Sequence, residues 1–267
     1  MATTDHAART ATDVRELVRR YYTAYYRDTL AIPGWQALVA LREEEEARLE
    51  TPHVERVRRV VGPDALRGRV LNVGCGTGGF NVLAAGAGAR AVGVDECAEA
   101  IDICGLKARR TAGGSFVQAH AEALPFPDRT FDFVYCFSAI EHVHSIEDSI
   151  REIARVTRPG GVIYLHTNNA WSLHEGHYKV LWVPFMPRAL ARIYLALLGR
   201  PTAYVGTLWR LTRRQLVRAF RQAGVDDLTF HDNDRPRESG SRLWPLLRWY
   251  YRLSGVTPFI EIVARRP

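Results

Sequence analysis

The sequence predicts a doubly wound α/β fold, in which helices cover both faces of a mostly parallel seven-stranded sheet. Two observations support this prediction. From about residue 68, short apolar or β-branched runs alternate with helical patterns, which is typical of parallel strands joined by helices. The first run leads into the glycine-rich stretch VGCGTGGF, where a strand is expected to turn sharply into a helix.

Residues 1–62 are expected to form an N-terminal helical extension. Its first helix, capped at residue 13, is amphipathic and carries Tyr21 and Tyr25 at helical spacing. A proline–glycine pair ends this helix, a second helix runs to about Thr51, and Pro52 is expected to begin a third. The tyrosines either pack against the core or contact a substrate or cofactor.

Residues 63–267 are expected to form one domain, since the chain has 267 residues, 47% of them hydrophobic. An aromatic-rich insertion at 168–206, after the fifth strand, is expected to act as a lid. A capping box at 212–215 should open a late helix. The expected strands cover residues 69–73, 89–95, 115–119, 131–137, 161–167, 225–231 and 258–264.

Composition narrows the possible partners and location. The net charge of +7 indicates an anionic substrate, a membrane surface or nucleic acid, although an arginine-rich source composition explains it equally well. We expect a cytoplasmic protein, because no leader-like start or long uncharged apolar stretch occurs. The cysteines form no C-x-x-C pair, and His174 and His177 lack a third ligand of clear spacing, so no metal is expected.

The glycine turn indicates an anionic or phosphate-bearing cofactor, because the unpaired N–H groups and the dipole of a helix start attract anions. Gly74, Gly76 and Gly79 also satisfy the G-x-G-x-x-G pattern of dinucleotide sites. Asp95 closes the second strand 21 residues after Gly74, where a carboxylate can accept hydrogen bonds from ribose hydroxyls. Both NAD and S-adenosylmethionine fit these residues.

Two further segments extend the pattern: AEALPFPDRTFDFVYCFSAIEHV and SIREIARVTRPGGVIYLHTNN. Together with VLNVGCGTGGF and VGVDE, they resemble the class I S-adenosylmethionine-dependent methyltransferases, in particular the small-molecule group that includes ubiquinone-biosynthesis methyltransferases. The resemblance covers residues 68–170 and implies a Rossmann-like fold, with S-adenosylmethionine as the cofactor.

The resemblance also implies roles for individual residues. The glycine turn would approach the methionine part of the cofactor, the acids after the second strand would bind the ribose, the 120–122 segment would edge the adenine, and a carbonyl after the fourth strand would lie near the methionine amine. Asn72 and His120 stand where the family commonly has acidic residues. The implied cofactor-binding residues are Asn72, Gly74, Cys75, Gly76, Gly78, Asp95, Glu96, His120, Ala121, Glu122 and Phe137.

We expect methyl transfer to a small, bulky, partly apolar acceptor of anionic or amphiphilic character, with oxygen favoured over carbon or nitrogen. The N-terminal helices, the insertion and residues 232–257 would wall the acceptor pocket. A nucleic-acid substrate is disfavoured, because the fourth strand lacks the Asn/Asp-Pro-Pro-aromatic motif that many nucleic-acid and protein methyltransferases use. RNA or protein methylation, a nicotinamide-dependent oxidoreductase and a regulatory binding protein remain the alternatives.

Histidine is the expected general base, since its neutral form accepts a proton near neutral pH. His142 is one candidate and His177, in the insertion, is the other. Glu141 and His142 are expected to begin the helix after the fourth strand, where a capping role competes with a catalytic one. The candidate substrate-binding residues are Tyr21, Tyr25, Glu141, His174 and Tyr178.

A final pattern lies after Pro187, where Leu190, Ile193, Tyr194 and Leu197 share one face of an expected helix. This face either packs against the domain or a second copy, or forms a surface that admits an amphiphilic acceptor or touches a membrane. The oligomeric state cannot be derived from the sequence.

Overall fold

The computed structural model describes residues 14–44, 46–111, 114–231 and 244–267. Seven strands form one sheet in the order β3-β2-β1-β4-β5-β9-β8. All neighbours pair in parallel except β9, which runs antiparallel to both β5 and β8. The strands are β1 (Arg69–Val73), β2 (Arg90–Asp95), β3 (Ser115–Gln118), β4 (Phe131–Phe137), β5 (Thr157–Asn168), β8 (Asp227–Phe230) and β9 (Phe259–Arg265). The predicted mostly parallel seven-stranded sheet is therefore confirmed.

Helices cover both faces of the sheet, because alternate side chains of each strand point to opposite sides. On β4, Val134 and Cys136 join the core beneath α6 (Ile146–Val156) and α8 (Arg213–Gln222), whereas Phe133 and Tyr135 join the core beneath α3 (Glu46–Val60) and α4 (Gly79–Gly86). Helix α5 (Ala98–Thr111) contacts β2 and β3. The capping box predicted at 212–215 is present at the start of α8.

The N-terminal extension is helical but differs from the prediction in detail. A helix at 14–23 continues into the π-helix η1 (Ala24–Thr29), followed by α2 (Trp35–Glu44) and α3. The expected cap at residue 13 lies outside the described residues. The prediction that Pro52 begins a new helix is wrong, because Pro52 lies inside α3. Its missing N–H group is tolerated there, since Val54 and Val57 on the same helix are buried against the sheet.

An ion pair joins this extension to the sheet. The Arg56 Nε of α3 donates to Glu261 Oε1 of β9 at 2.8 Å, and Tyr164 donates its hydroxyl to the same oxygen at 2.8 Å. Glu261 is buried, with 4% of its surface exposed. A buried carboxylate needs such partners, so this contact fixes α3 against the sheet.

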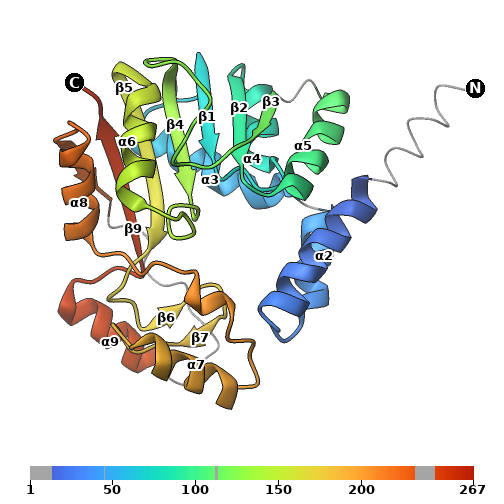
Figure 1. Ribbon diagram of the computed structural model, residues 1–267, viewed down its shortest axis with the longest axis vertical. Coiled ribbons are helices and arrows are strands. Elements are labelled where there is room, and N and C mark those ends of the chain that lie inside the picture. Colours follow the sequence, from blue (N-terminus) through green and yellow to red (C-terminus); the bar gives the residue numbers. More distant parts are fainter. Residues whose placement is uncertain (1–13, 45, 112–113, 232–243) are drawn as a thin grey trace, which may run out of the picture.

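The insertion after β5 forms a small lobe. It contains the hairpin β6 (His174–Glu175) and β7 (Val180–Leu181), the helix α7 (Arg188–Leu197) and the short helix η2 (Tyr204–Gly206). Figure 1 shows β6, β7 and α7 together with α9 (Trp244–Ser254) below the sheet. Leu30 and Ile32, from the N-terminal extension, are buried in the core of this lobe beside Trp182 and Leu195. Among the described helices, none is both long enough and apolar enough to span a bilayer.

Candidate functional site

The glycine turn after β1 is built around positive φ angles. Gly74, Gly76 and Gly78 have φ of 73°, 50° and 81°, values that residues with a side chain rarely adopt. A Cβ at Gly74 would overlap the Ala139 methyl, so this glycine permits the loop after β4 to pack against the turn. A Cβ at Gly76 would meet no atom within 4 Å. The open space in front of Gly76 is available to a ligand that approaches the backbone.

Asp95 stands beside this open space at the end of β2. Its Oδ2 accepts the N–H of Gly76 at 2.8 Å, and its Oδ1 accepts the N–H of Cys97 at 3.0 Å. Each carboxylate oxygen has a second lone pair for a ligand hydroxyl. Burial raises the pKa of Asp95 despite these hydrogen bonds. The residues present therefore fit the ribose and backbone-approach requirements of a nucleoside cofactor.

Side chains behind the turn hold it in place. Asn72 is buried on β1 and donates its Nδ2 to Asn81 Oδ1 of α4 at 2.7 Å. Cys75 is buried, while the Cys104 thiol donates to the Gly76 carbonyl at 3.2 Å and Lys107 donates to the Thr77 carbonyl at 2.8 Å. The expected cofactor contacts of Asn72 and Cys75 stay predictions.

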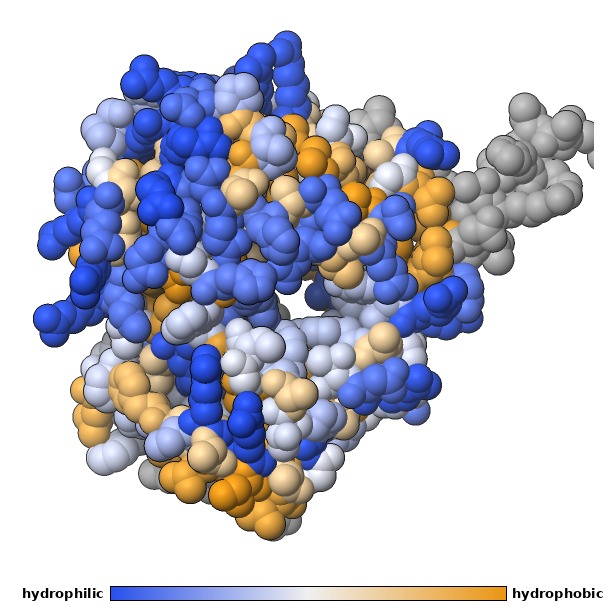
Figure 2. Space-filling view, viewed as in Figure 1, coloured by the Kyte–Doolittle hydropathy of each residue, from blue (hydrophilic) through white to orange (hydrophobic). Residues whose placement is uncertain are grey.

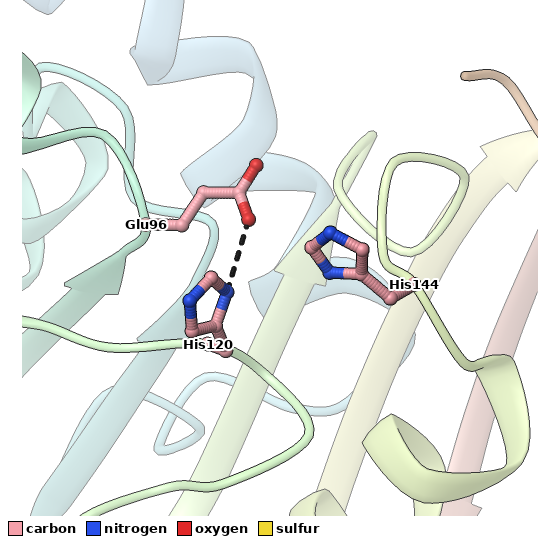
Figure 3. Close-up of side chains that lie close together, drawn as sticks. All are labelled: Glu96, His120 and His144. Carbon is pink, nitrogen blue, oxygen red and sulfur yellow. Dashed lines mark hydrogen bonds and ion pairs between the residues drawn. The ribbon is translucent and has the colours of Figure 1, made fainter. Parts of the chain in front are cut away.

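The predicted adenine edge forms an exposed rim. Figure 3 shows Glu96, His120 and His144 converging from three loops, with a 3.2 Å hydrogen bond between His120 Nδ1 and Glu96 Oε2. Glu122 instead uses its carboxylate to accept the backbone N–H groups of His144 and Ser145, at 2.6 and 3.0 Å. Its side chain thus holds the loop before α6, and the adenine contacts of His120, Ala121 and Glu122 stay predictions.

Phe137 ends β4, as predicted. Its ring stacks on that of His166, with a centroid distance of 4.1 Å, and lies tilted against that of His53, at 4.2 Å. Its ring thus belongs to an aromatic stack. The expected role of its carbonyl beside the methionine amine stays a prediction.

The helix after β4 begins later than predicted. It starts at Ile146, and Ser145 caps it by accepting the N–H of Asp148 at 3.2 Å. Glu141 and His142 lie in the loop before it, so the prediction that they begin the helix is wrong. Ser145 is a better helix start than Glu141, because its short side chain reaches the free N–H groups and two acidic residues, Glu147 and Asp148, lie in the first turn. The loop leaves Glu141 and His142 next to the insertion.

A cluster of acidic and imidazole side chains forms where this loop meets the insertion. His177 Nδ1 lies 2.9 Å from Glu175 Oε1, and His177 Nε2 lies 4.0 Å from Glu141 Oε1. The rings of His142 and His177 stand edge to face, with centroids 5.0 Å apart. Tyr204 of η2 lies beside them, with its hydroxyl 3.5 Å from His142 Nδ1. The structure thus brings both predicted catalytic histidines together.

The electrostatics of this cluster follow from its burial. Burial raises the pKa of Glu141, although the nearby His177 opposes the shift. Burial and the neighbouring His177 lower the pKa of His142 to about 4. Burial opposes the protonation of His177, but its hydrogen bond to Glu175 and the charges of Glu175 and Glu141 raise its pKa. His142 is therefore neutral near pH 7.

Tyrosines of the first helices connect the cofactor side to the insertion. The Tyr22 hydroxyl lies 2.9 Å from Thr77 Oγ1 in the glycine turn, and the Tyr25 hydroxyl lies 3.1 Å from that of Tyr204 in the insertion. Burial and the charge of Asp95 raise the pKa of Tyr21.

A cavity of about 220 Å³ lies within the insertion lobe. Its walls include Trp182, Val205 and Leu208, and Glu175 and His177 of the cluster also line it. Arg210 contributes a cation that lies 5.1 Å from the centre of the Trp182 ring. The cavity is mostly apolar, with charged groups at its border.

The other predicted substrate residues lie outside this convergence. His174 is exposed on β6 and is not among the described residues that line the cavity, and the Tyr178 side chain is buried in the core of the lobe. The sequence analysis missed Glu175 and Tyr204. Glu175 stands two residues before His177, and that spacing alone could have indicated it. Nothing in the sequence around Tyr204 indicates that its hydroxyl reaches Tyr25.

Comparisons with known proteins agree with this geometry. Residues 71–165 match the family model described as a methyltransferase domain. The chain is 30% identical to the sterol 24-C-methyltransferase of Schizosaccharomyces pombe, over 70% of this chain and 46% of that protein. It is 37% identical to a ubiquinone biosynthesis O-methyltransferase of Vibrio cholerae, over 38% of this chain and 42% of that protein. The chain thus spans less than half the length of these curated relatives.

A solved structure shows the same fold over nearly the whole chain. The PH0226 protein of Pyrococcus horikoshii matches 93% of this chain and 99% of its own, with a TM-score of 0.57 and 19% identity. The fold, the glycine turn with Asp95 and the matched domain place the chain among the class I S-adenosylmethionine-dependent methyltransferases. S-adenosylmethionine is the cofactor of this class, and the predicted resemblance is confirmed.

Proposed function

We propose that the chain transfers a methyl group from S-adenosylmethionine to a small amphiphilic acceptor bound in the insertion cavity. The observation that carries this proposal is the position of the Glu141–His142–His177 cluster, which borders the cavity through His177 and adjoins the glycine turn through the loop containing Ala139. The curated relatives include enzymes named for sterol and ubiquinone-biosynthesis methylation, and this supports a small, bulky acceptor.

The chemistry is an in-line displacement at the sulfonium methyl group. A lone pair of the acceptor forms the new bond to the methyl carbon, the sulfur–methyl bond breaks, and S-adenosylhomocysteine leaves. The protein contributes mainly by aligning the two reactants away from water. Asp95 and the glycine turn would hold the cofactor, and Trp182, Val205 and Leu208 would hold the apolar part of the acceptor.

We assign acceptor activation to His142 and His177. Oxygen is the favoured acceptor atom, with carbon and nitrogen as alternatives, because a hydroxyl is the group that most needs to lose a proton. Replacing either histidine by alanine should lower kcat by about 10²–10⁴-fold while cofactor affinity changes little. If both variants turn over as fast as the wild type, the histidines do not activate the acceptor, and alignment of the reactants is the remaining source of catalysis.

Two substitutions on α7 test whether the acceptor binds in the cavity. Ala191 lines the cavity on α7, whereas Ala196 is exposed on the same helix. Wild-type protein, methyl-labelled cofactor and a metabolite extract from the source should yield one labelled product. Ala191→Phe should abolish that product without weakening cofactor binding, and Ala196→Phe should leave it unchanged. A product that persists in a folded Ala191→Phe variant would place the acceptor elsewhere.

The alternative acceptors have distinct outcomes in the same assay. Methylation of added RNA, with binding that weakens steeply as salt rises, would favour a nucleic-acid methyltransferase. Label recovered in protein would favour a protein substrate. Cofactor binding without turnover on any extract would favour a regulatory binding protein.

The lobe that holds the cavity also exposes apolar side chains. Leu190, Ile193 and Leu197 of α7 are 55%, 57% and 81% exposed, and Trp249 and Leu253 of α9 are 62% and 65% exposed. Figure 2 shows this hydrophobic surface at the bottom of the molecule, where Figure 1 places α7 and α9. Leu190, Ile193 and Leu197 are therefore not packed within the described chain, whereas Tyr194 of the same predicted face packs against the core of the lobe.

We propose that this surface lies on an anionic membrane while the acceptor is taken up. Arginines lie on the same two helices, namely Arg188, Arg192, Arg248 and Arg252, and they complement an anionic headgroup layer. The protein should sediment with anionic vesicles and less with neutral ones. Ile193→Glu should reduce sedimentation, whereas Gln118→Glu on β3 should not. Absence of sedimentation in the wild type would reject the membrane contact and leave the cavity proposal intact.

A further inference from the structure

Glu141 is buried, yet one of its oxygens has no hydrogen-bond partner among the described residues. Thr167 donates its hydroxyl to Glu141 Oε2 at 2.8 Å. Glu141 Oε1 has no hydrogen bond to any described residue, and none of the surface of Glu141 is exposed. Leaving a buried carboxylate oxygen unsatisfied is costly, so a partner outside the protein chain is expected at this position.

The side chain that faces this oxygen is prepared for ligation. His177 Nδ1 is hydrogen-bonded to Glu175 Oε1 at 2.9 Å, which places the ring N–H on that nitrogen when the imidazole is neutral. The lone pair of Nε2 is then available, 4.0 Å from Glu141 Oε1. A carboxylate behind a histidine in this manner is the usual support for a metal-ligating imidazole.

His142 completes a set of three. One ligand atom from each of Glu141, His142 and His177 can be chosen so that all lie within 4.8 Å of one another. Metal–nitrogen and metal–oxygen bonds of zinc are about 2.0–2.2 Å, so two ligand atoms of a tetrahedral zinc lie about 3.3–3.6 Å apart. The 4.0 Å separation of His177 Nε2 and Glu141 Oε1 would have to close by about half an ångström on binding. No metal was expected from the sequence, because the third ligand becomes apparent only when the loop after β4 meets the insertion.

We propose that Glu141, His142 and His177 bind one divalent transition-metal cation of the zinc type. Two imidazole nitrogens and one carboxylate oxygen suit such a cation and leave a coordination position open. Glu175 and Thr167 orient two of the ligands from behind. Because His177 also lines the cavity, the cation borders the space where the acceptor is proposed to bind. With the cation bound, the two imidazoles have no free lone pair on the ligating nitrogens, so they would act on the acceptor through the cation and not as separate bases.

The rim formed by Glu96, His120 and His144 is the competing group of metal-ligand residues, and Figure 3 shows its arrangement. All three residues are exposed, and Glu96 Oε2 already lies within hydrogen-bonding distance of His120 Nδ1, at 3.2 Å. The rim therefore lacks the unsatisfied buried oxygen that marks the Glu141–His142–His177 cluster. Its residues serve as controls.

The test is metal binding by the full chain without cofactor or acceptor, so its outcome is independent of the proposed methyl transfer. Protein stripped with a chelator is incubated with Zn²⁺, dialysed and analysed for metal content, and Co²⁺ is used to read the ligand set by visible absorption. We expect one equivalent per chain in the wild type. His142→Ala and Glu141→Gln should each lose it, and His120→Ala and His144→Ala should retain it.

The orienting residues give a graded result. Glu175→Gln should weaken Zn²⁺ binding by about 10–100-fold without removing a ligand. Thermal unfolding in chelator identifies variants that fail to fold. His142→Ala is the decisive variant, because the only side-chain hydrogen bond of His142 among the described residues is the 3.5 Å contact with Tyr204. Absence of a stoichiometric metal in the wild type would overturn the proposal. Retention of metal in folded His142→Ala, or its loss in His120→Ala, would do the same.

Discussion

Replacement of Asp95 by asparagine tests the cofactor site most directly. The side chain keeps its shape but loses its charge, and one of its two acceptor oxygens becomes an NH₂ group that faces the N–H of Gly76 or of Cys97. A hydrogen bond to a charged group contributes about 1.5–3 kcal/mol, so loss of one such bond to the ribose should weaken S-adenosylmethionine about 10–150-fold.

Isothermal titration calorimetry with S-adenosylmethionine measures this change, and a parallel titration with NAD measures the rejected alternative. Asp102→Asn is the matched control, because Asp102 is an exposed acid on α5. Its affinity should equal that of the wild type. Unchanged affinity in a folded Asp95→Asn variant would refute the assignment of Asp95 to the cofactor, and with it the reasoning from the glycine turn.

Three further predictions concern pH, backbone geometry and a buried charge. Burial raises the pKa of Asp95, and only the ionised carboxylate accepts with both oxygens, so cofactor affinity should fall as pH is lowered through that raised pKa, but not in Asp95→Asn. Gly74→Ala should lower the free energy of unfolding by about 1–3 kcal/mol more than Gly34→Ala, measured with denaturant, because φ is near +70° at both sites but only Gly74 lacks space for a Cβ. An equal decrease in both variants would contradict the argument that a Cβ at Gly74 collides with Ala139. Arg56→Met should lower the free energy of unfolding by about 3–5 kcal/mol, because it leaves Glu261 buried without its cation. A decrease of less than about 1 kcal/mol, measured with denaturant, would contradict this account.

The sheet was predictable because its signals are local. Each strand is a short β-branched or apolar run, and the capping box that opens α8 needs only Thr212 and Gln215. Pro52 shows the limit of such rules, since burial of Val54 and Val57 keeps α3 helical where a local rule predicts an end. Tertiary packing therefore decides the helix boundaries that local patterns leave ambiguous.

The predicted cofactor residues come from consecutive motifs, whereas the proposed acceptor side depends on contacts between distant segments. Tyr25 and Tyr204 are 179 positions apart, and Glu141 meets His177 only because the loop after β4 and the insertion pack together. The face of α7 could not be assigned either. Its apolar pattern gives no direction of packing, and the structure buries Ala191 and Leu195 instead of the larger exposed side chains.

The tyrosine contacts of the first helices have a kinetic consequence. Tyr22 touches the glycine turn at Thr77, and Tyr25, less than one helical turn further on, touches Tyr204 beside the cavity. Because one continuous helical segment contacts both the glycine turn and the insertion, displacement of either tyrosine disturbs the other. We expect release of spent cofactor and entry of a new acceptor to share one opening step, whose rate then sets the upper limit of turnover.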